Sequence, residues 1–391
     1  MKTFAAVMTG KGTGAISTIE LYGNRAAEIV EQVFSPGAGE QGFKNRSVRF
    51  GKISDRDRSL DKVVIGREGL KSFTINCHGN PIIVSDVMSL LARNGAEPVG
   101  AERLLAEKLT SATTGTIEIE AAIAMLGTTT LHGTRIIANQ IDKGLAAKAA
   151  GWLEKANSLS PEKIRGEALE ILDNSRAAGL IIHGCRVLIT GPPNSGKSTL
   201  LNCLAGRPKA VVSHVAGTTR DWVTARCRAG NLCVEFMDTA GLEESAEGLA
   251  HSIAARSQRL ALELMAKSDL VLLVIDGSIP TCPIDRGLLD RIDSPKVLAV
   301  LNKRDLPIRL DLRRLGLKPA GPVAISAKFE TGIDELLTSI TQILAAKDFD
   351  TSLPVCFTKR QERILQGLAA AKSVESAVAL ISDLLTGKAR V

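Results

Sequence analysis

The sequence predicts a multidomain α/β protein in which a doubly wound domain with a mostly parallel sheet is inserted into a helical domain, after an N-terminal α+β domain. Three observations support this prediction. The 391 residues are too many for one ordinary core and suit two or three domains of roughly 100–200 residues each. Apolar residues recur at helical spacing on both sides of a central segment. Inside that segment, short apolar runs alternate with helical stretches, as in a parallel sheet covered on both faces.

The N-terminal α+β domain is expected over residues 1–97. Strand-like runs at 16–21, 63–65 and 73–77 are separated there by turn clusters such as Ser35-Pro36-Gly37. Short strands between tight turns favour a small sheet with few helices.

The helical domain is expected over residues 98–180 and 346–391. Leu145, Ala149 and Trp152 fall on one helical face, and Ser160 suits the N-cap of the last helix before the central domain. Because helical spacing returns after residue 364, we expect the tail to pack on the earlier helices.

The central domain is expected over residues 181–345. A helix should start at Gly196, after the first strand. The predicted strands are 186–190, 223–228, 232–237, 270–275, 297–301 and 323–325.

The bulk composition restricts the class of protein. Hydrophobic residues make up 45% and charged residues 23%, and no apolar run approaches the roughly 18 residues of a membrane span. We therefore expect a cytoplasmic protein with no membrane contact. The 7 cysteines include no Cys-x-x-Cys pair, which favours reduced thiols. The net charge of +7 suits a polyanion such as RNA, whereas an aromatic content of 3% leaves few stacking platforms.

Residues 191–198 form a complete Gly-x4-Gly-Lys-Ser loop between an apolar strand and a helix. Backbone N–H groups of such a loop cradle phosphates, Lys197 can reach the β/γ oxygens, and the Ser198 hydroxyl can ligate Mg²⁺. The nucleotide-binding residues expected here are Asn194, Ser195, Gly196, Lys197, Ser198 and Thr199.

A second motif indicates which nucleotide base is bound. Asn302, Lys303 and Asp305 follow the strand at 297–301 as an Asn-Lys-x-Asp motif, and a carboxylate there accepts from both N1–H and N2–H₂ of guanine. Adenine cannot offer that pairing, so GTP and GDP are expected and ATP is not. Residues 326–328 supply a supporting loop, with Ser326, Ala327 and Lys328 as expected contacts.

Two loops between these motifs match nucleotide-sensing switches. Asp238, Thr239, Ala240 and Gly241 end a strand, where an Asp would hold Mg²⁺ through water. Upstream, Thr218 and Thr219 lie in a Gly-Thr-Thr-Arg-Asp run, with Thr219 expected to bind Mg²⁺ and, with Lys197, to serve catalysis.

The Gly-Thr-Thr-Arg-Asp and Asp-Thr-Ala-Gly-Leu runs, with Asn194 in the P-loop, resemble the TrmE–Era–EngA–Septin-like GTPases. Within this family the chain is most similar to the tRNA-modifying MnmE (TrmE) branch. Residues 76–81 resemble its His-Cys-His-Gly-Gly-Pro stretch, and the domain order agrees.

The resemblance implies a Ras-like P-loop GTPase domain and a homodimer formed through the N-terminal domain. It also implies a MnmG-like partner, a tRNA substrate and hydrolysis assisted by K⁺. The K⁺ ligands of the family map to Asn194, Ser213, Val215 and Thr218.

This sequence differs from the family at residues that take part in the family's chemistry. Leu385 stands in place of the family's C-terminal Cys. Glu20 stands in place of an Arg that contacts formyl-tetrahydrofolate, and Thr74 stands in place of a Glu. Lys108 and Lys388 match the family's residues at their positions. We therefore do not expect folate binding of the family's kind.

More than one residue could orient the hydrolytic water. Leu242 follows Asp-Thr-Ala-Gly where Ras-like proteins have a Gln. The family uses a later Glu, for which we favour Glu247 over Glu243 and Glu244. Each is equally compatible with an exposed first helical turn.

Two functions follow from these features. The first is a GTPase in modification of the tRNA wobble uridine. The alternative is an Era-like or EngA-like GTP-dependent switch on RNA or the ribosome, without modification chemistry.

Overall fold

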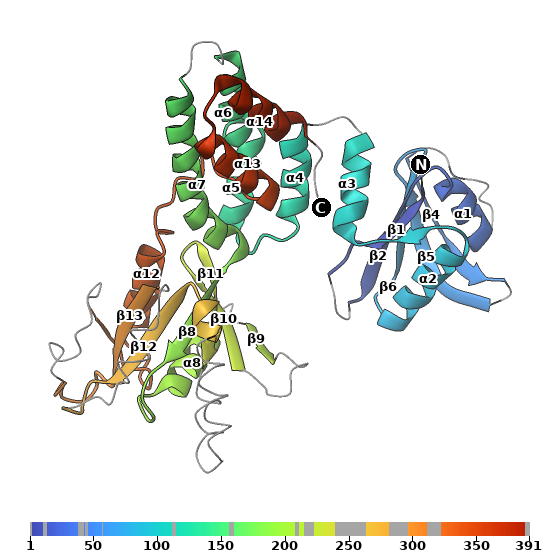
Figure 1. The fold of residues 1–391 in the computed structure, drawn as a ribbon. Helices are drawn as coiled ribbons and strands as arrows, with labels where there is room; N and C mark the ends of the chain where they lie inside the picture. The colour runs from blue at the N-terminus through green and yellow to red at the C-terminus, as the bar shows by residue number, and fades with distance from the viewer. Residues whose placement is uncertain are drawn as a thin grey trace, which may run out of the picture. The chain divides into compact units, whose positions relative to one another are not determined.

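The computed structural model divides the chain into two compact units, Met1–Leu126 and Gly127–Gly387 (Figure 1). The structure describes residues 2–10, 14–37, 43, 46–56, 58–111, 115–155, 160–207, 211–214, 223–238, 263–280, 296–310 and 322–387.

The N-terminal unit contains a sheet in the order β3-β4-β5-β6-β2-β1-β7, antiparallel except where β1 pairs with β7. Helices α1 and α2 cover one face, and their apolar residues join Ile19, Ile65 and Ile75 in the core. On the other face, Leu104 of α3 packs on Phe4 and Tyr22. The elements are β1 (Phe4–Val7), β2 (Ile16–Tyr22), α1 (Ala26–Val33), β3 (Phe34–Pro36), β4 (Ser47–Asp55), β5 (Arg58–Arg67), β6 (Ser72–His78), α2 (Pro81–Arg93), β7 (Glu97–Pro98), α3 (Ala101–Ser111) and α4 (Thr116–Met125).

The expected α+β fold of this region is confirmed, although the short strand-like runs underestimate the sheet. Strand β4 alternates buried and exposed residues, and its exposed positions include the apolar Val48 and Phe50. Charged residues separate the apolar residues of β4, so its sequence contains no apolar run by which the strand could be recognised.

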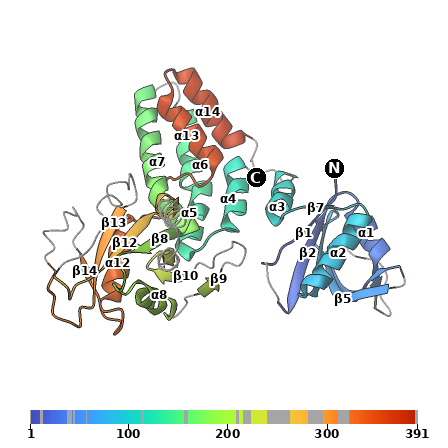
Figure 2. The same cartoon turned by 60° about the horizontal axis from the view of Figure 1, so that its bottom comes forward.

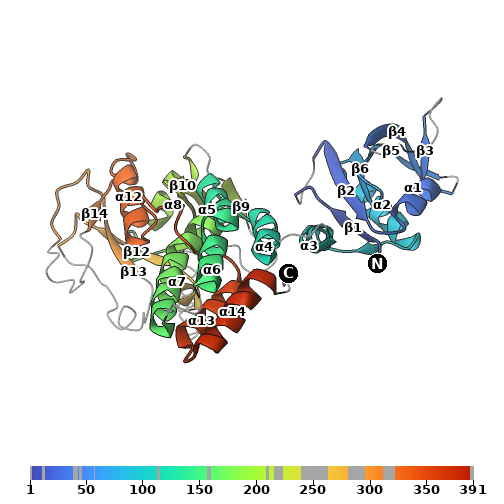
Figure 3. The same cartoon turned by 90° about the horizontal axis from the view of Figure 1, so that it is seen from above.

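The helical part of the second unit is built from two separated stretches of chain. Helices α5 (Leu131–Asp142), α6 (Leu145–Glu154) and α7 (Pro161–His183) precede the nucleotide domain, and α13 (Lys359–Ala370) and α14 (Val374–Thr386) follow it. Figure 3 shows α13 and α14 against α6 and α7. The predicted insertion of the central domain into a helical one is confirmed, and Ser160 caps α7 by accepting from Lys163 N.

One buried side chain holds the returning segment on these helices. Gln140 of α5 is fully buried; its Nε2 donates to Leu353 O at 3.1 Å, and its Oε1 accepts from Val355 N at 3.0 Å. The same amide also donates to Ile136 O and accepts from Leu145 N. Because both amide atoms are satisfied, the polar group stabilises the junction instead of costing free energy.

The central domain contains a sheet in the order β14-β13-β12-β8-β11-β10-β9 (Figure 2). The strands from β14 to β11 run parallel, and β10 and β9 are antiparallel to their neighbours. The elements are β8 (Cys185–Thr190), α8 (Lys197–Ala205), β9 (Val211–His214), β10 (Val223–Ala229), β11 (Leu232–Asp238), β12 (Leu270–Asp276), β13 (Lys296–Asn302), β14 (Val323–Ala324) and α12 (Ile333–Ile343).

The mostly parallel sheet of the prediction is confirmed, since every predicted strand of this domain lies within one residue of an observed one. β12 shows why: its first six residues are buried. Continuous apolar burial is typical of a central parallel strand.

The structure groups α3 and α4 with the N-terminal unit. The domain limits at 97, 180 and 345 stay predictions. None of the helices among the described residues is long and apolar enough to span a membrane.

Candidate functional site: the carboxyl edge of the parallel sheet

Four parallel strands end at one edge of the central sheet, and each carries a candidate residue there. The P-loop follows β8, while Asp238, Asp276 and Asn302 are the last residues of β11, β12 and β13. Ligands of doubly wound sheets bind outside the carboxyl ends of their strands. The sequence motifs therefore converge although they lie far apart along the chain.

Glycine is required at two points of the P-loop. Gly191 has φ 146° and Gly196 has φ 94°, both in the left-handed half of conformational space. A Cβ at Gly191 would overlap Val274 O, and one at Gly196 would overlap the Asn302 amide. The loop thus packs directly on the ends of β12 and β13. Asn194 has φ 60°, a conformation that Asn tolerates better than most residues.

The P-loop presents both a cation and an unsatisfied hydroxyl. Lys197 is buried, and its Nζ donates to Gly191 O at 2.8 Å and to Pro192 O at 3.1 Å. Ser195 is also buried, and its Oγ has no hydrogen-bond partner among the described residues. An orphan hydroxyl and an ammonium at the start of α8 fit an anionic phosphate group.

A hard-metal ligand pair lies beside them. Ser198 Oγ donates to Asp238 Oδ2 at 2.9 Å, so a hydroxyl and a carboxylate meet at the ends of α8 and β11. Mg²⁺ prefers such oxygen ligands and usually keeps several waters. These two residues fit the ion that the motifs imply.

The base-reading loops are tied to the P-loop through one amide. Asn302 is buried; its Nδ2 donates to Ser195 O at 2.8 Å, and its Oδ1 accepts from Ala327 N at 3.0 Å. Nearby, Ser326 Oγ donates to Asp305 Oδ1 at 2.6 Å, which orients the carboxylate expected to read guanine. Lys328 Nζ lies 5.2 Å from the centroid of the Phe329 ring.

Asp276 also lies at this edge of the sheet, although it belongs to none of the sequence motifs. Its Oδ2 accepts from Lys303 Nζ at 2.6 Å, and its Oδ1 accepts from the Ser278 backbone N and side-chain Oγ. Burial raises the pKa of Asp276, but the hydrogen bonds from Lys303 and Ser278 outweigh burial and lower the pKa overall. Its signal in the sequence is an acidic residue followed by Gly277 at the end of β12, whose first six residues are all buried.

Several predicted site residues lie outside the described residues. They are Val215, Thr218, Thr219, Thr239, Ala240, Gly241 and Glu247. Of Ser213 only the backbone is described, in β9 opposite Thr224. Thr199 is exposed on the first turn of α8. The ligands of K⁺ and the residue that orients water therefore stay predictions.

The residues aligned with the family's folate site do not fit formyl-tetrahydrofolate. Lys108 Nζ donates to Glu20 Oε1 at 2.5 Å and to Glu68 Oε2 at 2.9 Å, and Ser72 Oγ donates to Glu20 as well. Burial lowers the pKa of Lys108, but these carboxylates outweigh it and raise the pKa. The matching Lys108 is therefore neutralised from within, and buried Glu20 would repel the carboxylates of a folate. The other matching cation, Lys388, lies outside the described residues.

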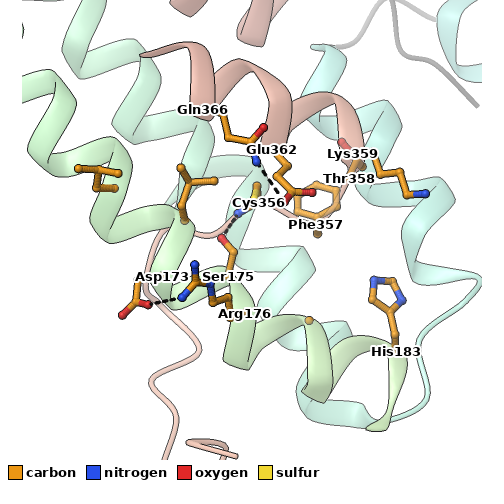
Figure 4. Close-up of a pocket in the computed structure, with 13 residues that line it drawn as sticks. Asp173, Ser175, Arg176, His183, Cys356, Phe357, Thr358, Lys359, Glu362 and Gln366 are labelled. Carbon is orange, nitrogen blue, oxygen red and sulfur yellow. Dashed lines mark hydrogen bonds and ion pairs between the residues drawn. The ribbon is translucent and has the colours of Figure 1, made fainter. Parts of the chain in front are cut away.

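A further hollow lies in the helical part, between α7 and α13 (Figure 4). It has a volume of about 620 Å³ and is lined by Arg176, His183, Cys356 and Glu362 among others. Burial lowers the pKa of His183. Both acidic and basic side chains line this hollow, so its charge points to no class of ligand.

Comparisons with known proteins agree with this architecture. The family model "GTP-binding protein TrmE N-terminus" matches residues 3–103, and the model "50S ribosome-binding GTPase" matches residues 186–303. The "tRNA modification GTPase MnmE" of Enterococcus faecalis is 28% identical over 379 residues, which cover 87% of this chain and 81% of that protein. The protein of the same name from Geobacillus thermodenitrificans is 26% identical over 416 residues, covering 96% of this chain and 89% of that protein.

Proposed function

We infer that this chain, which belongs to the MnmE/TrmE-like GTPases, binds GTP and hydrolyses it to GDP and phosphate in tRNA modification. The observation that carries the inference is the shared sheet edge. There Lys197, Ser198 and Asp238 offer a phosphate and metal site, and Asn302 links it to the loops of Asp305 and Ala327.

Among the described residues, one set acts on the phosphates of the nucleotide and another set acts on its guanine base. Lys197 and the N–H groups at the start of α8 bind and neutralise the phosphates, whose charge is redistributed during transfer. Ser198 and Asp238 would hold Mg²⁺, which neutralises charge on the phosphate oxygens when it is bound. Asp305 accepts from guanine, and Ser326 keeps its carboxylate in place.

The remaining catalytic roles belong to the switch segments. We assign a Mg²⁺ contact to Thr219 and water orientation to Glu247, and contacts to the γ-phosphate to residues 239–241. K⁺ held by Asn194, Ser213, Val215 and Thr218 would supply the positive charge that other GTPases take from an arginine finger. Support for K⁺ is the family resemblance, which places Asn194 in the P-loop.

Phosphate release from GTP tests the hydrolytic part of the proposal. The purified chain with Mg²⁺ should release phosphate from GTP and none from ATP above background. Lys197→Ala should lose most of this activity. A wild-type chain that binds GDP but leaves GTP intact over hours would contradict hydrolysis.

Nucleoside analysis tests the tRNA part. In a strain lacking this chain, modified wobble uridines should decrease, and the chain should restore them together with a MnmG-like partner. Leu385 stands where the family resemblance implies a Cys, and this substitution favours the second candidate, an Era-like or EngA-like switch on RNA. Unchanged wobble uridines, with GTP-dependent association with RNA, would establish that candidate instead. Either role would place the chain in the cytoplasm.

We also propose a homodimer formed through the N-terminal unit. Its support, besides the resemblance, is the β4–β5 strip, which we define as Val48, Phe50 and Val64. These residues are 68%, 58% and 37% exposed, and Phe50 pairs directly with Val64 across the two strands. Contiguous apolar surface of this kind marks protein–protein contacts.

A further inference from the structure

Asp276 and Lys303 form an ion pair at the edge where the guanine-reading motif begins. Asp276 ends β12, and its register partner on β13 is Asn302, the residue before Lys303. The Asp276 side chain is 12% exposed and that of Lys303 is 34% exposed. A charge-assisted bond of 2.6 Å in this half-buried setting is stronger than an exposed surface pair.

The backbone around this pair is held in an uncommon conformation. Lys303 has φ 65°, which costs a residue with a Cβ free energy and persists only where the surroundings enforce it. Three main-chain bonds enforce it here: Gly277 N to Asn302 O at 3.0 Å, Arg304 N to Ile325 O at 2.9 Å and Leu306 N to Lys303 O at 2.9 Å. The turn therefore fixes where the Lys303 side chain leaves the chain.

The two restraints act on opposite ends of one side chain. The turn fixes Cα of Lys303, and Asp276 fixes Nζ, so the four-carbon stem between them loses most of its freedom. Lysine stems lie readily along apolar surfaces while their charged ends stay hydrogen-bonded. Asp276 is itself fixed, because Ser278 donates to it from both its backbone N at 2.9 Å and its Oγ at 2.6 Å.

We propose that Asp276 is a positioning residue for guanine nucleotides: by holding the Lys303 ammonium it makes the lysine stem a preformed wall of the guanine pocket. The assignment rests on the guanine binding proposed above for Asn302 and Asp305. Preformed walls strengthen binding because the ordering cost is met before the ligand arrives.

The test is the affinity of Asp276→Asn for GDP, measured by titration with a fluorescent GDP analogue. The variant keeps the size of the side chain and loses its charge, and its affinity should fall about 5- to 30-fold. Asp269→Asn is the matched control, because Asp269 precedes the other end of β12 and accepts from Arg186 N at 2.8 Å, away from the nucleotide edge. Its affinity for GDP should equal that of the wild type.

A double-mutant cycle distinguishes positioning from a general structural role. Lys303→Met keeps an apolar stem and removes the ammonium, so adding Asp276→Asn to it should cost no further affinity. Full additivity of the two losses would overturn the proposal, as would an unchanged GDP affinity of Asp276→Asn.

Two further outcomes are separated by the same titrations. If the wild-type chain fails to bind GDP, the proposed function is wrong, and this result differs from a wild-type chain that binds GDP and an Asp276→Asn variant that binds it equally well. If Asp276→Asn does not fold, Ser278→Ala replaces it, since that change removes the Oγ bond that fixes Asp276. It should weaken GDP binding in the same direction, and an affinity within twofold of the wild type would then overturn the proposal.

Discussion

In the proposed guanine site, we expect the Asp305 carboxylate to decide which base is bound. Asp305→Asn replaces an acceptor by a donor, so the N1–H and N2–H₂ of guanine lose their partner whereas the O2 carbonyl of xanthine gains one. We expect GDP affinity to fall by at least about 100-fold and xanthine nucleotides to be preferred. Competition between GDP, XDP and ADP for the wild type and the variant measures this. Equal affinity of the wild type for ADP and GDP would contradict the assignment.

The neutralised lysine of the N-terminal unit leads to a prediction about folate. Because Lys108 is held by Glu20 and Glu68, the chain should not bind formyl-tetrahydrofolate at concentrations up to about 1 mM, for which the binding free energy is only about 4 kcal/mol. Equilibrium dialysis measures this, and GDP binding by the same sample shows that the protein is folded. Saturable folate binding at micromolar concentration would show that the cluster opens.

Residue identities in the site could be predicted where they belong to a contiguous motif. The residues of the P-loop and Asn302, Lys303 and Asp305 are such cases, and the structure brings their loops to one edge. The partner of Lys303 could not be predicted, because Asp276 lies on another strand and meets it only through the register of β12 and β13. Likewise, no local pattern shows that the Asn302 amide reaches Ser195 O.

Among the elements, the junction of α5 with the returning segment depends on Gln140. Gln140→Leu should lower the free energy of unfolding by roughly 2–6 kcal/mol, because the Leu145 and Val355 N–H groups would lose their acceptor in the core. Urea or thermal unfolding followed by circular dichroism measures this. The control is Gln366→Leu on the exposed side of α13, which should change stability by no more than about 0.5 kcal/mol. Equal stability of the two variants would mean that the junction tolerates unpaired groups.

The strands buried on both faces were predicted directly, whereas the half-exposed strand β4 was missed. The central parallel strand β12 appears as an apolar run because its residues are buried on both faces of the sheet. β4 was missed because its outward residues mix Val48 and Phe50 with charged neighbours. The reason is physical: only the inward half of an antiparallel strand is constrained by the core, so the outward half carries no periodic signal.

For the whole molecule, the first prediction is its assembly. The chain should be a homodimer by light scattering at micromolar concentration, with and without GTP. Phe50→Asp should give monomers, since it places a charge in the middle of the β4–β5 strip. Leu70→Asp is the control, because Leu70 is 75% exposed and outside the strip. A wild-type monomer, or a dimer that survives Phe50→Asp, would exclude this surface.

The last prediction concerns the rate of GTP hydrolysis. If Asn194 and the segment 213–218 hold K⁺ near the phosphates, hydrolysis should be faster in K⁺ than in Na⁺ at equal ionic strength, where general screening is matched. The gain can reach several kcal/mol of transition-state stabilisation if the closed site excludes water, because a fixed charge there acts at low dielectric. Single-turnover rates in the two salts measure it.

Asn194→Ala should abolish the difference between the salts while GDP affinity stays within a few-fold, since the ion acts mainly on charge that develops in the transition state. Asn202→Ala is a matched control, because Asn202 lies exposed on α8 and is not among the expected nucleotide or K⁺ ligands. Rates that are the same in K⁺ and Na⁺ for the wild type would make Asn194 a loop residue only, one chosen because it tolerates φ 60°. A salt effect that survives Asn194→Ala would place the cation on other ligands. The comparison therefore separates an ion-dependent mechanism from a backbone requirement at the same residue.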